Sequence, residues 1–111
     1  MNIEKTKAQM KKGVLELCIL SIISNKEAYA SDILDDLKTS KLIVVEGTLY
    51  PLLTRLKNEG LLSYRWEESK SGPPRKYYEI TEIGKKVLYE LKIGWNELVS
   101  AVDKLTKKSK S

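Results

Sequence analysis

Hydrophobic residues recur with helical spacing over most of the chain, and the first two helices that they predict differ in character. Residues 3–24 predict a helix that is polar and cationic at first and apolar on nearly every side from Val14 to Ile23, which implies burial on several sides. A second, short helix is expected over residues 30–38, with Ser31 or a neighbour as its cap. Three aspartates in its early turns suit the helix dipole, a role favoured over a metal cluster because no further ligands accompany them.

A third helix, predicted over residues 47–58, is amphipathic. Its leucines recur at i, i+3, i+4 and i+7 and form one apolar stripe. Pro51 must lie in or near the first turn, where its missing N–H does least harm, and Gly60 ends the helix. The opposite face carries donor-rich side chains that can reach phosphates and base edges: Thr48, Tyr50, Thr54, Arg55, Lys57 and Asn58.

Strand spacing follows this helix. Residues 62–66 alternate as in a half-buried strand, and residues 75–80 predict a second strand. Between them, residues 67–74 are expected to form a polar loop that cannot continue the ladder, because it contains Ser-Gly-Pro-Pro. The result is a hairpin whose long tip carries three cations: Lys70, Arg75 and Lys76.

The order of these elements predicts a mostly α fold with a small β-hairpin (α+β class). Three helices followed by a hairpin is the winged helix-turn-helix order, in which the third helix enters the major groove and the wing contacts backbone or minor groove. A small α+β domain with an ordinary hairpin is the alternative. We expect the winged helix-turn-helix unit to span residues 1–80.

A long last helix is predicted to begin after Thr81, which caps it, and to end near Lys107, leaving residues 108–111 as a tail. It would be ~39 Å long at ~1.5 Å per residue. Its apolar positions are spaced 3, 4, 3, 4 and 3 apart, a heptad seam: Leu88, Leu91, Trp95, Leu98, Val102 and Leu105. A head of some 80 residues is too small to bury this length, so residues 81–107 are interpreted as a dimerisation helix in a homodimer. Packing back onto the first helix of the same chain is the alternative, and both can hold together.

Charge is concentrated in particular segments. The chain of 111 residues, enough for one core, has a net charge of +5. Residues 1–13, 54–76 and 101–111 each sum to +3, whereas residues 14–46 sum to −3. A polyanionic partner such as double-stranded DNA would explain this, because neutralised phosphates release counterions. An ordinary solvated surface explains it equally well, so charge alone does not decide.

Several kinds of chemistry are excluded by composition. Without His and with one Cys, the chain cannot build a Cys/His zinc site, a Ser-His-Asp triad or an internal disulfide. Cys18 is interpreted as a small buried hydrophobe. No glycine-rich phosphate loop is present. We therefore expect no enzyme, no metal and no cofactor.

Membrane insertion and export are not predicted. No apolar run approaches the ~20 residues that a bilayer span needs. Lysines precede an apolar stretch and Ala28-Tyr29-Ala30 resembles a cleavage site, but Glu16 interrupts the stretch and Lys26 and Glu27 stand just before that site. A cytoplasmic protein is the expectation.

Four spaced motifs resemble the PadR family of bacterial transcriptional regulators over nearly the whole chain. They are Gly47-Thr48-Leu49-Tyr50-Pro51-Leu52-Leu53-Thr54-Arg55-Leu56, Glu59-Gly60-Leu61-Leu62, Gly72-Pro73-Pro74-Arg75-Lys76-Tyr77-Tyr78 and Thr81-Glu82-Ile83-Gly84. The resemblance implies a dimeric winged-helix repressor with a C-terminal dimerisation helix. The single long last helix is similar to the short, LmrR-like subfamily.

The residues expected to bind follow from these two interpretations together. Thr48, Tyr50 and Thr54 would contact DNA from the third helix, and contacts to phosphates or within the groove would come from Arg55, Lys57, Lys70, Arg75 and Lys76. Trp95 resembles the aromatic residue of LmrR-like proteins that stacks on planar drugs at the dimer interface. The first helix does not carry this resemblance, and Met10, Gly13 and Leu17 are assigned to the same site without it. A Trp that only packs the dimer is the alternative. A protein- or ligand-binding module without a DNA function is the alternative for the whole chain.

Overall fold

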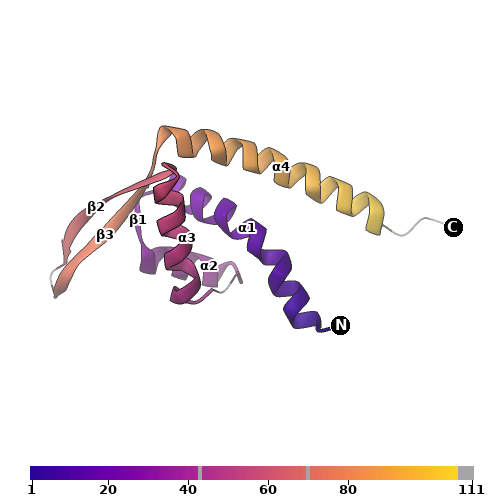
Figure 1. The fold of residues 1–111 in the computed structure, drawn as a ribbon, viewed down its shortest axis with the longest axis horizontal. Helices are drawn as coiled ribbons and strands as arrows, with labels where there is room; N and C mark the ends of the chain where they lie inside the picture. Colours follow the sequence, from indigo (N-terminus) through magenta and orange to yellow (C-terminus); the bar gives the residue numbers. More distant parts are fainter. Residues whose placement is uncertain (43, 70, 108–111) are drawn as a thin grey trace.

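The computed structural model describes residues 1–42, 44–69 and 71–107, and these form four helices and one three-stranded antiparallel sheet (Figure 1). The elements in order are α1 (Ile3–Asn25), β1 (Ala28–Tyr29), α2 (Ala30–Thr39), α3 (Glu46–Asn58), β2 (Leu62–Ser69), β3 (Gly72–Ile80) and α4 (Glu82–Thr106). The predicted α+β class and the winged-helix order of three helices and a hairpin are confirmed.

The core lies where the second half of α1, α2, α3 and the base of the sheet meet. Its fully buried side chains are mostly aliphatic: Ile19, Leu20, Ile23, Ile33, Leu37, Leu49, Leu53 and Leu56. Each stabilises the fold by about 1.5–3 kcal/mol of apolar burial. The predicted leucine stripe of α3 is therefore the face that holds this helix on the core.

The wing formed by β2 and β3 is longer than the sequence predicts. Residues 67–69 and 72–74 belong to the strands and not to a polar loop, since Glu67 pairs with Arg75 and Ser69 pairs with Gly72, with one irregularity between Glu67 and Ser69. Two prolines fit in β3 because β1 pairs only with the base of that strand, at residues 77–78, so the tip has a free edge.

Two further features of the core differ from expectation. The strand β1 has no counterpart in the sequence prediction, and its last residue, Tyr29, caps α2 in place of Ser31. The Tyr29 N–H donates to Oδ2 of Asp32 at 3.0 Å. Pro51 is the sixth residue of α3, which agrees with its predicted place in or near the first turn.

A tight junction joins the sheet to α4. The Thr81 hydroxyl accepts from the N–H of Gly84 at 2.9 Å and donates to the carbonyl of Gly60 at 2.7 Å, which confirms Thr81 as the cap. The first turn of α4 presses so closely on the chain before β2 that a Cβ at Gly84 would overlap the carbonyl oxygen of Leu61. This contact fixes where α4 leaves the winged head.

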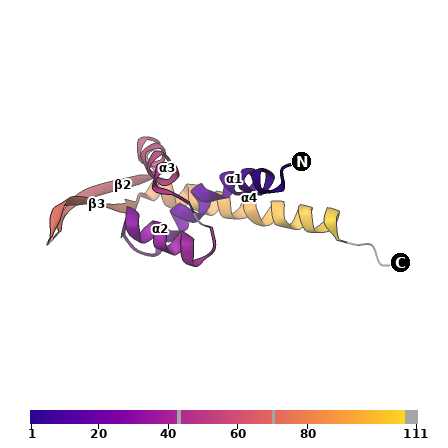
Figure 2. The ribbon, with the colours of Figure 1, turned by 90° about the horizontal axis from the view of Figure 1, so that it is seen from below.

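Beyond this head the molecule is elongated, 63 × 32 × 21 Å, because two helices extend past the core. The first half of α1 and the second half of α4 both point away from the wing and diverge toward the chain termini (Figure 1). Seen from below, α4 forms a long arm with α1 beside it (Figure 2). Both projecting segments are largely exposed within this chain.

Candidate nucleic-acid interface

The exposed face of α3 carries every side chain that the sequence assigns to it. Thr48, Tyr50, Thr54, Arg55 and Lys57 are all exposed, on the side of the helix opposite the buried leucines. Tyr50 and Thr54 border a shallow hollow on this surface. Donors and acceptors on one uncovered helix are the arrangement that reads base edges in a major groove.

Tyr64 joins this helix to the wing. The ammonium of Lys57, on α3, lies 5.8 Å from the centre of the Tyr64 ring, and that of Lys76, on β3, lies 4.6 Å from the same centre. Lys76 also lies 5.6 Å from the ring centre of Trp66, which is exposed. Helix and wing therefore share one cationic surface supported by aromatic rings, a contribution that the sequence prediction missed. The sequence could have indicated this surface, because Tyr64 and Trp66 lie on one face of a strand and Lys76 pairs with Trp66 on the neighbouring strand.

Arg75 lies on the other face of the wing, because successive residues of a strand point to opposite sides. Its guanidinium lies 4.0 Å from the ring centre of Tyr29, and that ring packs 4.7 Å from the ring of Tyr77. The neighbouring residues Arg75 and Lys76 are thus separated, and only Lys76 shares a face with α3. Lys70 lies outside the described residues.

The Arg75 face of the wing has a mixed charge. Arg65 pairs with Glu27 at 2.8 Å, with Glu67 at 2.9 Å and with Glu79 at 3.6 Å. Hydrogen bonding to Arg65 lowers the pKa of Glu27, so this carboxylate keeps its negative charge. Three carboxylates around one guanidinium leave no excess of positive charge there.

Arg55 is held by carboxylates as well. Its Nη2 lies 2.8 Å from Oε2 of Glu16, on α1, and its Nε donates to Oε2 of Glu59 at 3.2 Å. Glu16 is the more buried partner, with 22 % of its side chain exposed. A phosphate would have to compete with both carboxylates for this guanidinium.

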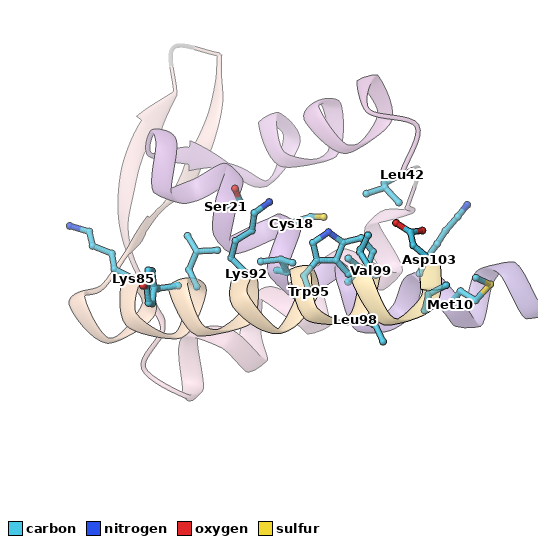
Figure 3. Close-up of a pocket in the computed structure, with 16 residues that line it drawn as sticks. Met10, Cys18, Ser21, Leu42, Lys85, Lys92, Trp95, Leu98, Val99 and Asp103 are labelled. Atoms are coloured by element: carbon cyan, nitrogen blue, oxygen red, sulfur yellow. The ribbon is translucent and has the colours of Figure 1, made fainter. Parts of the chain in front are cut away.

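A second candidate site lies between α1 and α4, where an apolar groove of about 1060 Å³ is open along both helices. Figure 3 shows the Trp95 ring beside Val99 on this groove, with Cys18 and Met10 contributed by α1. Of the residues assigned to an effector, Trp95, Met10 and Leu17 line the groove. Gly13 does not.

The groove also contains residues that the sequence prediction did not assign. They are mainly Val14, Cys18, Tyr89, Lys92 and Val99. Helical spacing from Leu17 and Trp95 would have found several of them. Burial raises the pKa of the Cys18 thiol, and the charge of Lys92 offsets part of this effect, so the thiol is neutral.

The heptad seam of α4 becomes more exposed toward the C-terminus. Leu88 is half-buried against the core, as is Val87. The other seam residues, from Leu91 onward, are exposed, from 36 % for Trp95 to 86 % for Leu105. This chain alone covers only the start of the seam.

Residues 1–42, 44–69 and 71–107 include no buried Asp, Glu, Lys or Arg side chain and no group of three or more Cys, Asp or Glu side chains that could hold a metal ion. None of the helices in residues 1–42, 44–69 and 71–107 is both long and apolar enough to cross a bilayer.

Known proteins share this architecture. The model of the transcriptional regulator PadR-like family matches residues 19–90. A PadR-like transcription factor from Bacteroides fragilis is 56 % identical, with a TM-score of 0.77 over 92 % of this chain and 99 % of that one. A PadR family transcriptional regulator from Eggerthella lenta is 32 % identical, with a TM-score of 0.88 over 96 % and 94 %. A PadR-like regulator from Bacillus cereus is 41 % identical, with a TM-score of 0.80 over 91 % and 99 %.

Proposed function

The chain belongs to the PadR-like family of transcriptional regulators, which bind DNA, and we propose that it is a cytoplasmic, homodimeric repressor of the short, LmrR-like kind. Residues 1–80 serve as the DNA-binding head and residues 81–107 as the dimerisation helix. A head of this kind recognises one half of a palindromic site, so two copies read both halves.

The observation that carries this proposal is the shared surface of α3 and the wing around Tyr64. With α3 in the major groove, Thr48, Tyr50 and Thr54 face base edges. Lys57 and Lys76 flank them on the wing side, where phosphates run. The remaining proposed phosphate contacts are Arg55, Lys70 and Arg75.

The proposed dimer forms through the exposed part of the α4 seam. Side chains such as Leu91, Leu98 and Val102 leave a contiguous apolar stripe open to water. A second copy related by a two-fold axis covers this stripe with its own and holds the two heads at a fixed separation. Two recognition helices about 34–36 Å apart address successive turns of the major groove.

The proposed effector is a planar aromatic molecule bound in the groove of α1 and α4. Trp95 offers a flat face for stacking, and Met10 and Leu17 supply apolar contacts. Because α4 belongs to both the groove and the proposed interface, a bound ligand changes how the two heads are spaced. It releases DNA provided that it prefers the released geometry.

The DNA-binding proposal is tested by selecting bound fragments from the source genome and titrating the enriched duplex in graded salt. We expect Lys76→Ala to weaken binding and to flatten the slope of log K against log salt by about 0.9, and Arg75→Ala, on the other face of the wing, to have a smaller effect in the same direction. The matched control is Lys104→Ala, in the last turn of α4 and far from the wing. Wild-type slopes in both wing variants would contradict the role of the wing. A selection that enriches no DNA fragment would contradict the proposed DNA binding itself.

A further inference from the structure

We infer that one face of the first half of α1 is a second phosphate-binding strip, formed by Lys5 and Lys12 and running on from the surface of α3. This inference rests on the proposed DNA binding and extends it to the duplex that flanks the segment read by α3. The strip would give a role to the positive charge of residues 1–13, which neither the core nor the wing explains.

The contact between Glu16 and Arg55 shows which face of α1 is turned toward α3. Glu16 Oε2 lies 2.8 Å from Nη2 of Arg55. Lys12 precedes Glu16 by four residues and Lys5 precedes it by eleven, close to one and three helical turns. Both lysines therefore lie on the face of α1 that meets α3, and Lys5 stands about 16 Å along the helix axis from Glu16.

This face is separate from the groove. The side of α1 that lines the groove carries Met10, Val14 and Leu17, and Lys11 borders the groove with them. A partner helix covering the groove would leave Lys5 and Lys12 uncovered. In Figure 2 the first half of α1 lies on the same side of α4 as α3 does, so one duplex can reach both.

The two lysines are also available to an anion. Both are exposed, and they take part in none of the ion pairs formed within residues 1–42, 44–69 and 71–107. By contrast, the nearest cation of α3, Arg55, is already held by two carboxylates. A distance of about 16 Å spans roughly five base pairs at ~3.4 Å per step, so the strip meets phosphates beyond those near α3.

The test is the salt dependence of binding to a labelled mixed-sequence duplex of about 30 base pairs, because phosphate contacts do not need a specific sequence. The variant is Lys5→Ala/Lys12→Ala. The matched control is Lys7→Ala/Lys104→Ala, which removes the same charge from another side of α1 and from the far end of α4. All four positions are exposed, and helix content by circular dichroism checks that both variants fold.

We expect the strip variant to flatten the slope of log K against log salt by about 1.8, two phosphates at ~0.9 each, and the control to keep the wild-type slope. Between about 50 and about 200 mM salt, wild-type affinity should fall roughly tenfold further than that of the strip variant. A wild-type slope in the strip variant overturns the strip alone. An equal change in both variants, which reflects net charge only, also overturns it. Absence of binding by the wild type overturns the strip and the proposed function together.

Discussion

Gly84 allows the close approach of α4 to the chain before β2, and Gly84→Ala should destabilise the protein although it replaces glycine in a helix. An added Cβ would overlap the carbonyl oxygen of Leu61 and lie 2.7 Å from Cγ1 of Ile80. The Ile80 side chain can adjust, but the Leu61 carbonyl is backbone. It also accepts the N–H of Thr81 at 3.1 Å, so moving it breaks a second contact.

The loss in the free energy of unfolding can be summed from the contacts that the added methyl group would disturb. Displacing the first turn of α4 loses the Thr81–Leu61 hydrogen bond, about 1 kcal/mol, and weakens the Thr81 cap, about 1 kcal/mol. Residual overpacking adds about 2 kcal/mol, and the better helix propensity of Ala returns about 1 kcal/mol. We expect a net loss of about 3 kcal/mol, which lowers Tm by about 12 °C for a chain of this size.

Thermal and urea unfolding followed by circular dichroism measure this loss. Every variant must be compared at one protein concentration, since formation of the proposed dimer would contribute to the apparent stability. The control is Gly47→Ala on α3, where an added Cβ meets nothing within 4 Å. It should leave stability unchanged or raise it by up to ~1 kcal/mol. A Gly84→Ala protein as stable as the wild type would refute the proposed close contact.

Three further predictions concern α4 and its groove. Leu98→Glu should convert a dimer to a folded monomer in sedimentation velocity, because Leu98 is exposed in the single chain, and a dimer that persists contradicts the seam. Planar aromatic compounds should quench tryptophan fluorescence, and Trp95→Ala should abolish this quenching whereas Trp66→Ala, on the wing, should not. The reverse result would show that the ligand binds at the wing. The Cys18 thiol should be alkylated more slowly than glutathione at pH 7, and the rate should rise only at higher pH, because burial raises the pKa of the thiol and keeps it in the unreactive protonated form. A rate equal to that of glutathione would show an ionised thiol and contradict this prediction.

Most of the fold can be read from local patterns. The leucines of α3 repeat every three or four residues because one side of the helix is buried, and Thr81 is visible as a cap because a short polar residue precedes a periodic segment. The strand β1 could not be predicted, since two residues carry no period and their pairing with β3 depends on the tertiary fold. The length of the wing depends on the pairing of β2 with β3, and β1 reaches only residues 77–78, which leaves Pro73 and Pro74 on a free edge.

Part of the candidate site could likewise be predicted from the sequence, and part could not. The exposed residues of α3 follow from its amphipathic pattern, whereas the partners of Arg55 come from a distant helix and needed the structure. One assignment could have been sharper from sequence alone, because strand alternation already places Arg75 and Lys76 on opposite faces of the wing. Gly13 follows Met10 by three residues and precedes Leu17 by four, so helical spacing alone could not exclude it from the groove. The structure was needed to show that Val14 lines the groove and Gly13 does not.

The neighbouring residues Glu16 and Leu17 connect two separate regions of the molecule through α1, the groove and the helix α3. Leu17 lines the groove, while Glu16 grips Arg55 on α3. If α1 rotates to admit the proposed effector beside Leu17, the Glu16 carboxylate moves with the same turn of the helix. Arg55 must then either follow it or lose the 2.8 Å contact between the two side chains. One helix would thus connect the groove to α3 directly.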